Sequence, residues 1–332
     1  MSMPNIENCP GTLATGNTTY SAACLRRVFE GRKVQHILPY NSPATDDTTN
    51  ALFEENRKRL SISGVQEKFS VILDKNKLRL IGEGERGSHI LKPIPGAGRI
   101  PGQMPANEHL TMQIARQVYH IETAENALIF FQNGAPAYIT KRFDRNSDGG
   151  KLAKEDFASL TGRTPQTHGE NYKYKGNYLE LFEQMKEHLP AYKIEAAKLF
   201  KLIVFNYLFS NGDAHLKNFA LLETLQRDFR LSPAYDLMNT RMHADDSDFA
   251  LEDGLLPRNI GQGTIWVQLK LLAEKAELTR KQTDEIMNQM MTEQQGVEQL
   301  IGASFLADRY KRSYLQAFQT RIKKLRKQAQ SS

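Results

Sequence analysis

The sequence lacks the features that define several common protein classes. Only two of its 332 residues are cysteine, Cys9 and Cys24, which are too few for a disulfide framework and too isolated for a zinc site. No run of 18 or more apolar residues is present, so we expect no transmembrane helix. The first 16 residues are polar and have no apolar core, so we expect no signal peptide. These absences predict a protein of the reducing cytoplasm with no membrane partner.

Positive charge is concentrated at one end of the chain. The net charge is +6, but residues 308–328 alone contain eight Lys or Arg and one Asp, so the remainder is close to −1. In this stretch Leu315, Phe318, Ile322 and Leu325 recur at helical spacing, with basic residues between them. This pattern favours an amphipathic terminal helix, packed on a helical lobe with its charges in solvent, over a surface for nucleic acid or a partner protein.

Strand patterns dominate the first part of the chain. Short helices are predicted at residues 21–31 and 50–59, and a longer one through Leu110, Ile114 and Val118. The predicted strands are residues 69–73, 77–81, 88–91, 127–131 and 137–140.

Helical patterns dominate after Arg163. The predicted helices are residues 178–188, 194–209, 266–278, 279–291 and 297–327. Strands first and helices later is an α+β pattern. We therefore predict a smaller, strand-rich N-terminal lobe over residues 1–144 and a larger, all-helical C-terminal lobe over residues 145–332.

The most informative stretch is a polar loop, Asn-Gly-Asp-Ala-His-Leu-Lys-Asn, at residues 211–218. It follows a long apolar segment that ends at Phe209. A second polar loop, Ser-Pro-Ala-Tyr-Asp, follows at residues 232–236. Polar groups on loops that rigid elements support are frequent sites of chemistry. We interpret the two loops as the catalytic and metal-binding loops of a phosphoryl-transfer enzyme.

Phosphoryl transfer requires a cation for the phosphates, ligands for magnesium and a group that orients the attacking hydroxyl. Asp213 is the candidate acceptor of the substrate hydroxyl proton. Asn218 and Asp236 are candidate Mg²⁺ ligands, since this ion needs only one or two protein ligands beside phosphate and water. Lys92, at the end of a predicted strand, is the candidate phosphate-binding lysine.

Each of these residues has a simpler interpretation. Asp213 follows Asn-Gly and is equally consistent with a turn. His215 alone is typical of a structural histidine, and Lys92 before a proline is consistent with a plain strand end. The segment 61–68 has a single glycine and is consistent with a polar connector, although its small residues also suit a phosphate cradle. The order of the elements along the chain is more specific than any one of them.

Five ordered motifs carry a resemblance to a known family. They are Ser61-Ile-Ser-Gly-Val-Gln-Glu-Lys68, His89-Ile-Leu-Lys-Pro93, Lys141-Arg-Phe-Asp-Arg145, Asn211-Gly-Asp-Ala-His-Leu-Lys-Asn218 and Ser232-Pro-Ala-Tyr-Asp236. Together they resemble the HipA family of bacterial serine/threonine protein kinases, over about residues 58 to 320. The resemblance implies a divergent two-lobed kinase fold that uses ATP and Mg²⁺.

The resemblance also implies roles for individual positions. Asp213 would be the catalytic base, Asn218 and Asp236 would hold magnesium, and Glu108 would pair with Lys92. The implied ATP contacts are a lid of Ser63, Gly64, Val65, Gln66, Glu67 and Lys68, the phosphate-binding Lys92, an interlobe linker of Lys141, Arg142 and Phe143, and the loop residues His215 and Tyr235.

Two further expectations follow from the resemblance. Only about 60 residues precede the lid, so the chain resembles the compact HipT type, in which the N-terminal subdomain is absent and a separate HipS-like small protein can supply it. Ser61 and Ser63 match autophosphorylation sites of the family. A phosphate there adds about −1.5 to −2 charge, and it would compete with the ATP phosphates for the same lid.

The implied function is that of a toxin in a bacterial toxin–antitoxin system. Some family members phosphorylate an aminoacyl-tRNA synthetase and so halt translation, and their antitoxin is of the HipB type, which would provide the only link to DNA. Two alternatives stay open. A small-molecule phosphotransferase also uses an Asp-x-His-x-x-Asn loop, and a DNA-bound co-repressor could retain a vestigial kinase site.

Overall fold

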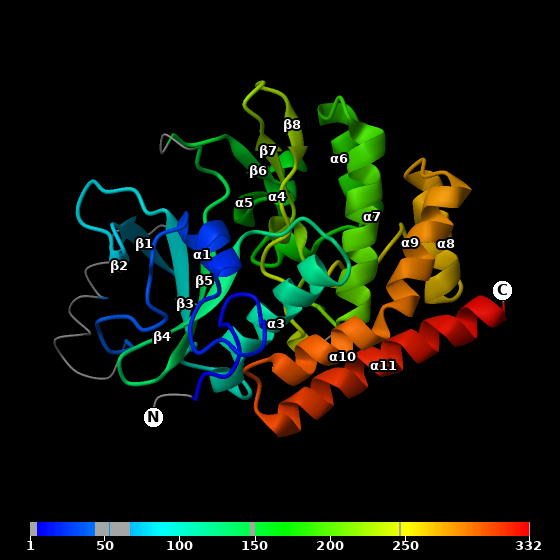
Figure 1. The fold of residues 1–332 in the computed structure, drawn as a ribbon. Coiled ribbons are helices and arrows are strands. Elements are labelled where there is room, and N and C mark those ends of the chain that lie inside the picture. The colour runs from blue at the N-terminus through cyan, green and yellow to red at the C-terminus, as the bar shows by residue number, and fades with distance from the viewer. Residues whose placement is uncertain (1–4, 44–52, 54–66, 147–149, 246, 332) are drawn as a thin grey trace. The chain divides into compact units, whose positions relative to one another are not determined.

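The computed structural model describes residues 5–43, 53, 67–146, 150–245 and 247–331 (Figure 1). The chain forms two compact units. Unit 1 consists of Met1–Gln113, Ala124–Gly150 and Gln299–Lys311, and unit 2 consists of Ile114–Thr123, Lys151–Glu298 and Arg312–Ser332.

Unit 1 is built on an antiparallel five-stranded sheet with the order β2-β1-β3-β5-β4. The strands are β1 (Phe69–Asp74), β2 (Lys77–Leu80), β3 (His89–Pro93), β4 (Asn126–Phe130) and β5 (Pro136–Lys141). Every residue of β4 is buried, which agrees with the apolar run that follows Asn126. All five predicted strands are confirmed, with ends that shift by one or two residues.

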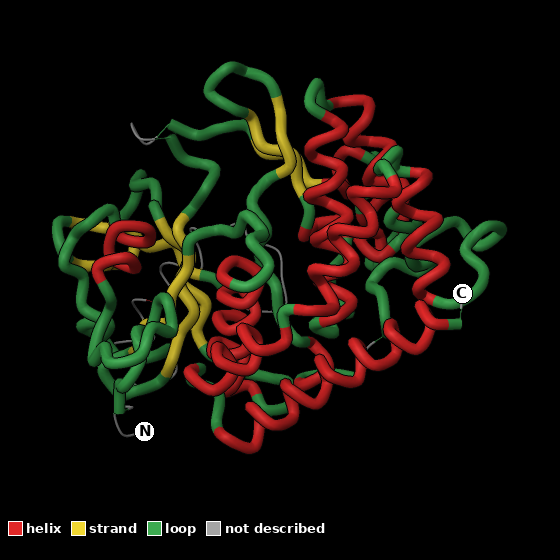
Figure 2. The backbone as a smooth tube through the Cα atoms, turned by 45° about the vertical axis from the view of Figure 1, so that its right-hand side comes forward, coloured by secondary structure: helices red, strands yellow, loops and turns green. Residues whose placement is uncertain are grey.

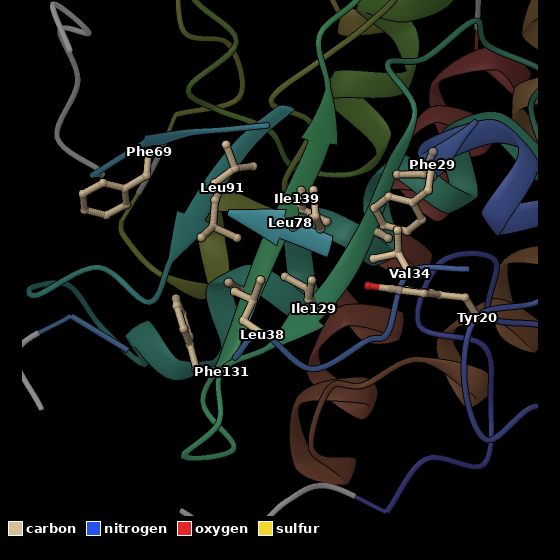
Figure 3. Close-up of a cluster of buried hydrophobic side chains, with 14 of the residues drawn as sticks. Tyr20, Phe29, Val34, Leu38, Phe69, Leu78, Leu91, Ile129, Phe131 and Ile139 are labelled. Carbon is tan, nitrogen blue, oxygen red and sulfur yellow. The ribbon is translucent and has the colours of Figure 1, made fainter. Parts of the chain in front are cut away.

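Unit 1 also contains α1 (Ala22–Phe29) and most of α3 (Met104–Gln117), whose residues from Ile114 on belong to unit 2. The Ser21 hydroxyl accepts a hydrogen bond from the Cys24 N–H and so caps α1 at the predicted position. The hydrophobic core of unit 1 draws its side chains from α1, the N-terminal loops and the sheet (Figure 3). Its labelled members are Tyr20, Phe29, Val34, Leu38, Phe69, Leu78, Leu91, Ile129, Phe131 and Ile139.

Unit 2 is mainly helical, which confirms the α+β class. Its longer helices are α6 (Leu179–His188), α7 (Tyr192–Leu208), α8 (Ile265–Lys275) and α9 (Arg280–Thr292), with parts of α10 (Gln294–Ala303) and α11 (Asp308–Gln330). Two single-turn helices, α4 (Phe157–Leu160) and α5 (Pro165–His168), precede them. In the ranges that the structure describes, no helix combines the length and apolarity needed to cross a membrane.

The expectation of an all-helical C-terminal lobe was wrong in one respect. Unit 2 contains an antiparallel three-stranded sheet of β6 (Lys154–Asp156), β7 (Ala220–Glu223) and β8 (Phe229–Leu231). The strands have only three or four residues each, too few for a period-2 pattern to appear in the sequence. Figure 2 shows them in yellow, with β8 beside α7.

The terminal helix packs as predicted. Phe318 of α11 stacks on Phe209 at the end of α7, with ring centroids 4.8 Å apart. The single helix expected over 297–327 is, however, two helices, α10 and α11. Ser304 explains the break, because its hydroxyl and its N–H both donate to the carbonyl of Ile301 and compete with helical hydrogen bonding.

The β7–β8 hairpin offers a matched test of burial. Leu222 is 2% exposed, whereas Leu225 at the turn is 76% exposed. We expect Leu222→Ala to lower the free energy of unfolding by about 2–5 kcal/mol, because it leaves a cavity. Leu225→Ala should change it by no more than about 0.5 kcal/mol. Urea denaturation of both variants checks this; equal losses would contradict the packing of the hairpin.

Candidate functional site

Two of the predicted residues of unit 1 form a buried ion pair. Lys92 lies on β3 and Glu108 on α3, and Lys92 Nζ is 2.6 Å from Glu108 Oε1. Both side chains are only 4% exposed. Lys92 Nζ also lies 5.2 Å from the centre of the Tyr138 ring, on the neighbouring strand β5. The predicted pairing of Glu108 with Lys92 is confirmed.

The other predicted residues of unit 1 are only partly described. Glu67 is exposed and Lys68 is half-buried, directly before β1. The remaining lid residues, Ser61, Ser63, Gly64, Val65 and Gln66, lie outside the described residues.

The predicted linker follows β5. Lys141 Nζ lies 3.0 Å from Glu30 Oε1, and this contact lowers the pKa of Glu30. Arg142 forms a two-point ion pair with Asp144, at 2.9 and 2.6 Å. Phe143 is half-buried between them in the sequence. The ion pairs give this stretch a defined conformation; its contact with adenine stays a prediction.

The predicted catalytic loop in unit 2 is held where it leaves α7. Ser210 has a positive φ of 53°, which turns the chain out of the helix. Thr240, the first residue of the 3₁₀ helix Thr240–Met242, then hydrogen-bonds to the chain on both sides of Asn211. Its hydroxyl accepts from the Gly212 N–H at 2.9 Å and donates to the Ser210 carbonyl at 3.1 Å. The direction of the loop is therefore fixed before Asp213.

Within the loop, the backbone N–H of His215 ties two of the predicted residues together. It donates to the Asp213 carbonyl at 2.8 Å and to Asn218 Oδ1 at 3.1 Å. Asp213 is exposed, whereas His215 is 7% exposed. Burial, with the nearby Lys173 ammonium, lowers the pKa of His215 to about 3, so the ring is neutral. Its Nδ1 atom is buried without a hydrogen-bond partner in the described structure.

A tyrosine bond joins the second loop to the first. The Tyr235 hydroxyl donates to the Lys217 carbonyl at 2.8 Å. The residues that follow Tyr235 and Lys217 in the sequence are Asp236 and Asn218, so this bond ties the segments that carry the two predicted metal ligands to each other. Asp236 has a positive φ of 57°, a conformation that costs free energy in a residue with a side chain.

These two residues fit the needs of a magnesium ion. Asn218 offers an amide oxygen, of which one lone pair accepts the His215 N–H, and Asp236 offers a carboxylate. Hard oxygen donors in small number are what Mg²⁺ takes from a protein when phosphate and water complete its shell. The Nδ1 atom of His215, which has no hydrogen-bond partner among the described residues, is a further polar atom that a ligand could contact.

Sequence reasoning missed two residues of unit 2, one that donates a hydrogen bond to Ser210 Oγ before the loop and one that donates to Asp213. Arg321 of α11, expected in solvent, is buried; its guanidinium lies 2.6 Å from Asp248 Oδ1 and 4.6 Å from the centre of the Tyr207 ring. Burial acts to raise the pKa of Asp248, but the hydrogen bonds from Arg321 and Lys324 outweigh it and lower the pKa. A charged residue within a basic helix gives no sequence signal of such a role.

The second missed residue is Tyr174. Its hydroxyl donates to Asp213 Oδ1 at 2.7 Å. Tyr174 begins a Tyr-Lys-Gly-Asn-Tyr segment that is rich in aromatic residues, but its partner lies 39 residues further along the chain. No local pattern connects the two.

Comparison with known proteins identifies the family. The model of the HipA-like C-terminal domain matches residues 60–298, and the chain belongs to this family. In Sinorhizobium fredii, the putative kinase Y4dM is 32% identical over 260 residues, and the putative kinase Y4mE is 30% identical over 194. These alignments cover 73% and 56% of this chain, but only 59% and 44% of the relatives. The chain thus spans about half the length of these curated relatives.

Two solved structures share the fold. HipA of Shewanella oneidensis, from a complex with HipB and operator DNA, superposes with a TM-score of 0.60 at 20% identity, over 79% of this chain and 63% of that one. The Helicobacter pylori proinflammatory kinase CtkA superposes with a TM-score of 0.50 at 15% identity, over 77% of this chain and 92% of that one. The predicted divergent, kinase-like two-lobed fold is confirmed.

The buried ion pair can be tested without any activity. We expect Lys92→Met or Glu108→Leu alone to destabilise the protein by about 3–5 kcal/mol, because each leaves an unpaired buried charge. The double variant should recover most of this loss. As a control, Lys186→Met breaks an exposed pair with Glu277 and should cost at most about 1 kcal/mol. Additive losses in the double variant, measured by urea denaturation, would contradict a direct pair.

Proposed function

We propose that the protein is an ATP- and Mg²⁺-dependent serine/threonine protein kinase. The buried Lys92–Glu108 pair carries this proposal. Protein kinases hold the ATP phosphates with a strand lysine that a helix glutamate orients, and both must be in place for activity. The names of the Sinorhizobium relatives and the fold of the two solved structures support the same activity.

The residues of unit 2 suit the transfer step. Asp213 is exposed, so a hydroxyl of a protein substrate can reach it and pass its proton to the carboxylate. Asn218 and Asp236 would hold Mg²⁺, which when bound neutralises charge on the phosphates. Lys92 would contact the phosphates from unit 1. The roles of Glu67, Lys68, Lys141, Arg142, Phe143, His215 and Tyr235 toward the nucleotide follow the family resemblance and belong to the same proposal.

The biological role that we propose is that of a toxin. The family resemblance supports an aminoacyl-tRNA synthetase as the substrate, with growth arrest as the result. It also supports autophosphorylation of Ser61 and Ser63 as the means by which the kinase activity is restrained, since a phosphate on the lid would repel the phosphates of ATP. The Shewanella relative is described with HipB and operator DNA. By analogy, a HipB-type antitoxin is the partner proposed here, with DNA contacted only through it, and a HipS-like small protein is a second candidate partner.

Phosphate transfer provides the direct test. Wild-type protein with γ-labelled ATP and Mg²⁺ should label proteins in a bacterial lysate, and also dephosphorylated casein. Asp213→Asn should lower this labelling by at least about a hundredfold, the scale on which a general base contributes. Lys186→Gln, on an exposed surface, should leave the labelling unchanged.

Each outcome has a clear meaning. Label confined to small molecules would replace the proposal by a small-molecule phosphotransferase. No ATP turnover in any fraction would support the co-repressor alternative. Labelling that survives in Asp213→Asn would remove Asp213 from the mechanism.

A further inference from the structure

The Asp213 carboxylate accepts a hydrogen bond from a side chain with no assigned role. Tyr174 Oη donates to Asp213 Oδ1 at 2.7 Å, a short contact of the kind that forms between a hydroxyl and an ionised carboxylate. The Tyr174 ring also packs edge-on against His215, with ring centroids 5.2 Å apart. One tyrosine therefore touches two residues of the predicted catalytic loop.

Two neighbouring tyrosines hold the same loop. The buried Tyr178 donates its hydroxyl to the Ala214 carbonyl at 2.7 Å. The Tyr172 hydroxyl accepts from Lys217 Nζ at 3.3 Å. We call Tyr172, Tyr174 and Tyr178 the tyrosine clamp. Its three hydrogen bonds are made with Asp213, Ala214 and Lys217, so the clamp contacts the loop along most of its length.

The clamp has a support of its own. Its backbone pairs with residues 252–254 through three hydrogen bonds of 2.9 to 3.0 Å, in which Tyr174 and Gly176 accept and Tyr178 donates. Gly176 has a φ of 85°, a backbone conformation that favours glycine at this turn. The backbone of Tyr174 is thus fixed independently of its bond to Asp213.

This arrangement has a consequence for the chemistry. An exposed aspartate side chain ordinarily samples several rotamers, and only some of them direct the carboxylate at an incoming hydroxyl. A donor on a rigid support selects one of them before substrate arrives. A carboxylate has about four acceptor positions on two oxygens, so a hydrogen bond to Oδ1 is compatible with a second one from a substrate.

We propose that Tyr174 is a positioning residue that holds the Asp213 carboxylate in the rotamer that accepts the proton of the substrate hydroxyl. This inference rests on the proposed kinase function. The opposite role would be that of a pseudosubstrate, in which the tyrosine hydroxyl occupies the acceptor and excludes the substrate. The two roles predict opposite changes in turnover.

The decisive variant is Tyr174→Phe, which removes one oxygen and keeps the ring against His215. With dephosphorylated casein as acceptor, we expect kcat to fall about tenfold, the effect of losing one hydrogen bond to a charged group. The KM for ATP should not change. Tyr192→Phe is the matched control, since it removes a hydroxyl that donates to the Ala276 carbonyl at 3.0 Å elsewhere in unit 2. Its kcat should equal that of the wild type.

An unchanged or raised kcat in Tyr174→Phe would overturn the proposal, and a raised value would establish the pseudosubstrate role. A second readout does not depend on activity. Amide hydrogen exchange of the peptide spanning 211–219 should speed up about tenfold in Tyr174→Phe and not in Tyr192→Phe. If the wild-type protein labels neither lysate proteins nor casein, the proposed function fails, while the exchange rates still decide whether Tyr174 holds the loop; equal rates in all three proteins would reject it.

Discussion

The buried charge of Lys92 is the constraint on which the architecture of unit 1 depends. An ammonium group at 4% exposure costs several kcal/mol unless a carboxylate meets it at close range. Glu108 does so at 2.6 Å, and this requires β3 and α3 to keep one register relative to each other. The apolar cluster of unit 1 supplies the driving force for folding, whereas the ion pair selects the arrangement that places Lys92 beside Glu108, the pair on which the proposed kinase function rests.

In unit 2, hydrogen bonds rather than a buried ion pair fix the conformation of the predicted catalytic loop. This loop has little regular structure, so its conformation has to be fixed by side chains from elsewhere in the chain. Thr240 fixes the entry to the loop, Tyr235 ties its end to the loop of Asp236, and the tyrosine clamp follows its middle. Each contact comes from a different segment. In a loop that is ordered in this way, the loss of conformational entropy occurs when the protein folds and not when a substrate binds.

The sequence was informative wherever the signal is local. The strands of unit 1, the helices α6 to α9 and the two polar loops follow from apolar spacing and from contiguous motifs, and the five motifs together identified the family. The pairing of Lys92 with Glu108 came from the resemblance. What the sequence could not show are non-local contacts between short elements. The pairing of β6 with β7, the bond of Tyr174 to Asp213 and the ion pair of Arg321 with Asp248 each join residues that lie far apart in the chain, and no pattern in either segment marks them.

Nucleotide binding tests the central claim most directly, because it does not require the substrate to be known. Isothermal titration with a non-hydrolysable ATP analogue should show binding to the wild type that Mg²⁺ strengthens. Lys92→Met should weaken binding both with and without the metal. Asp236→Asn should remove chiefly the part that depends on Mg²⁺. Affinity that is the same with and without Mg²⁺ in the wild type, or no binding at all, would contradict the account.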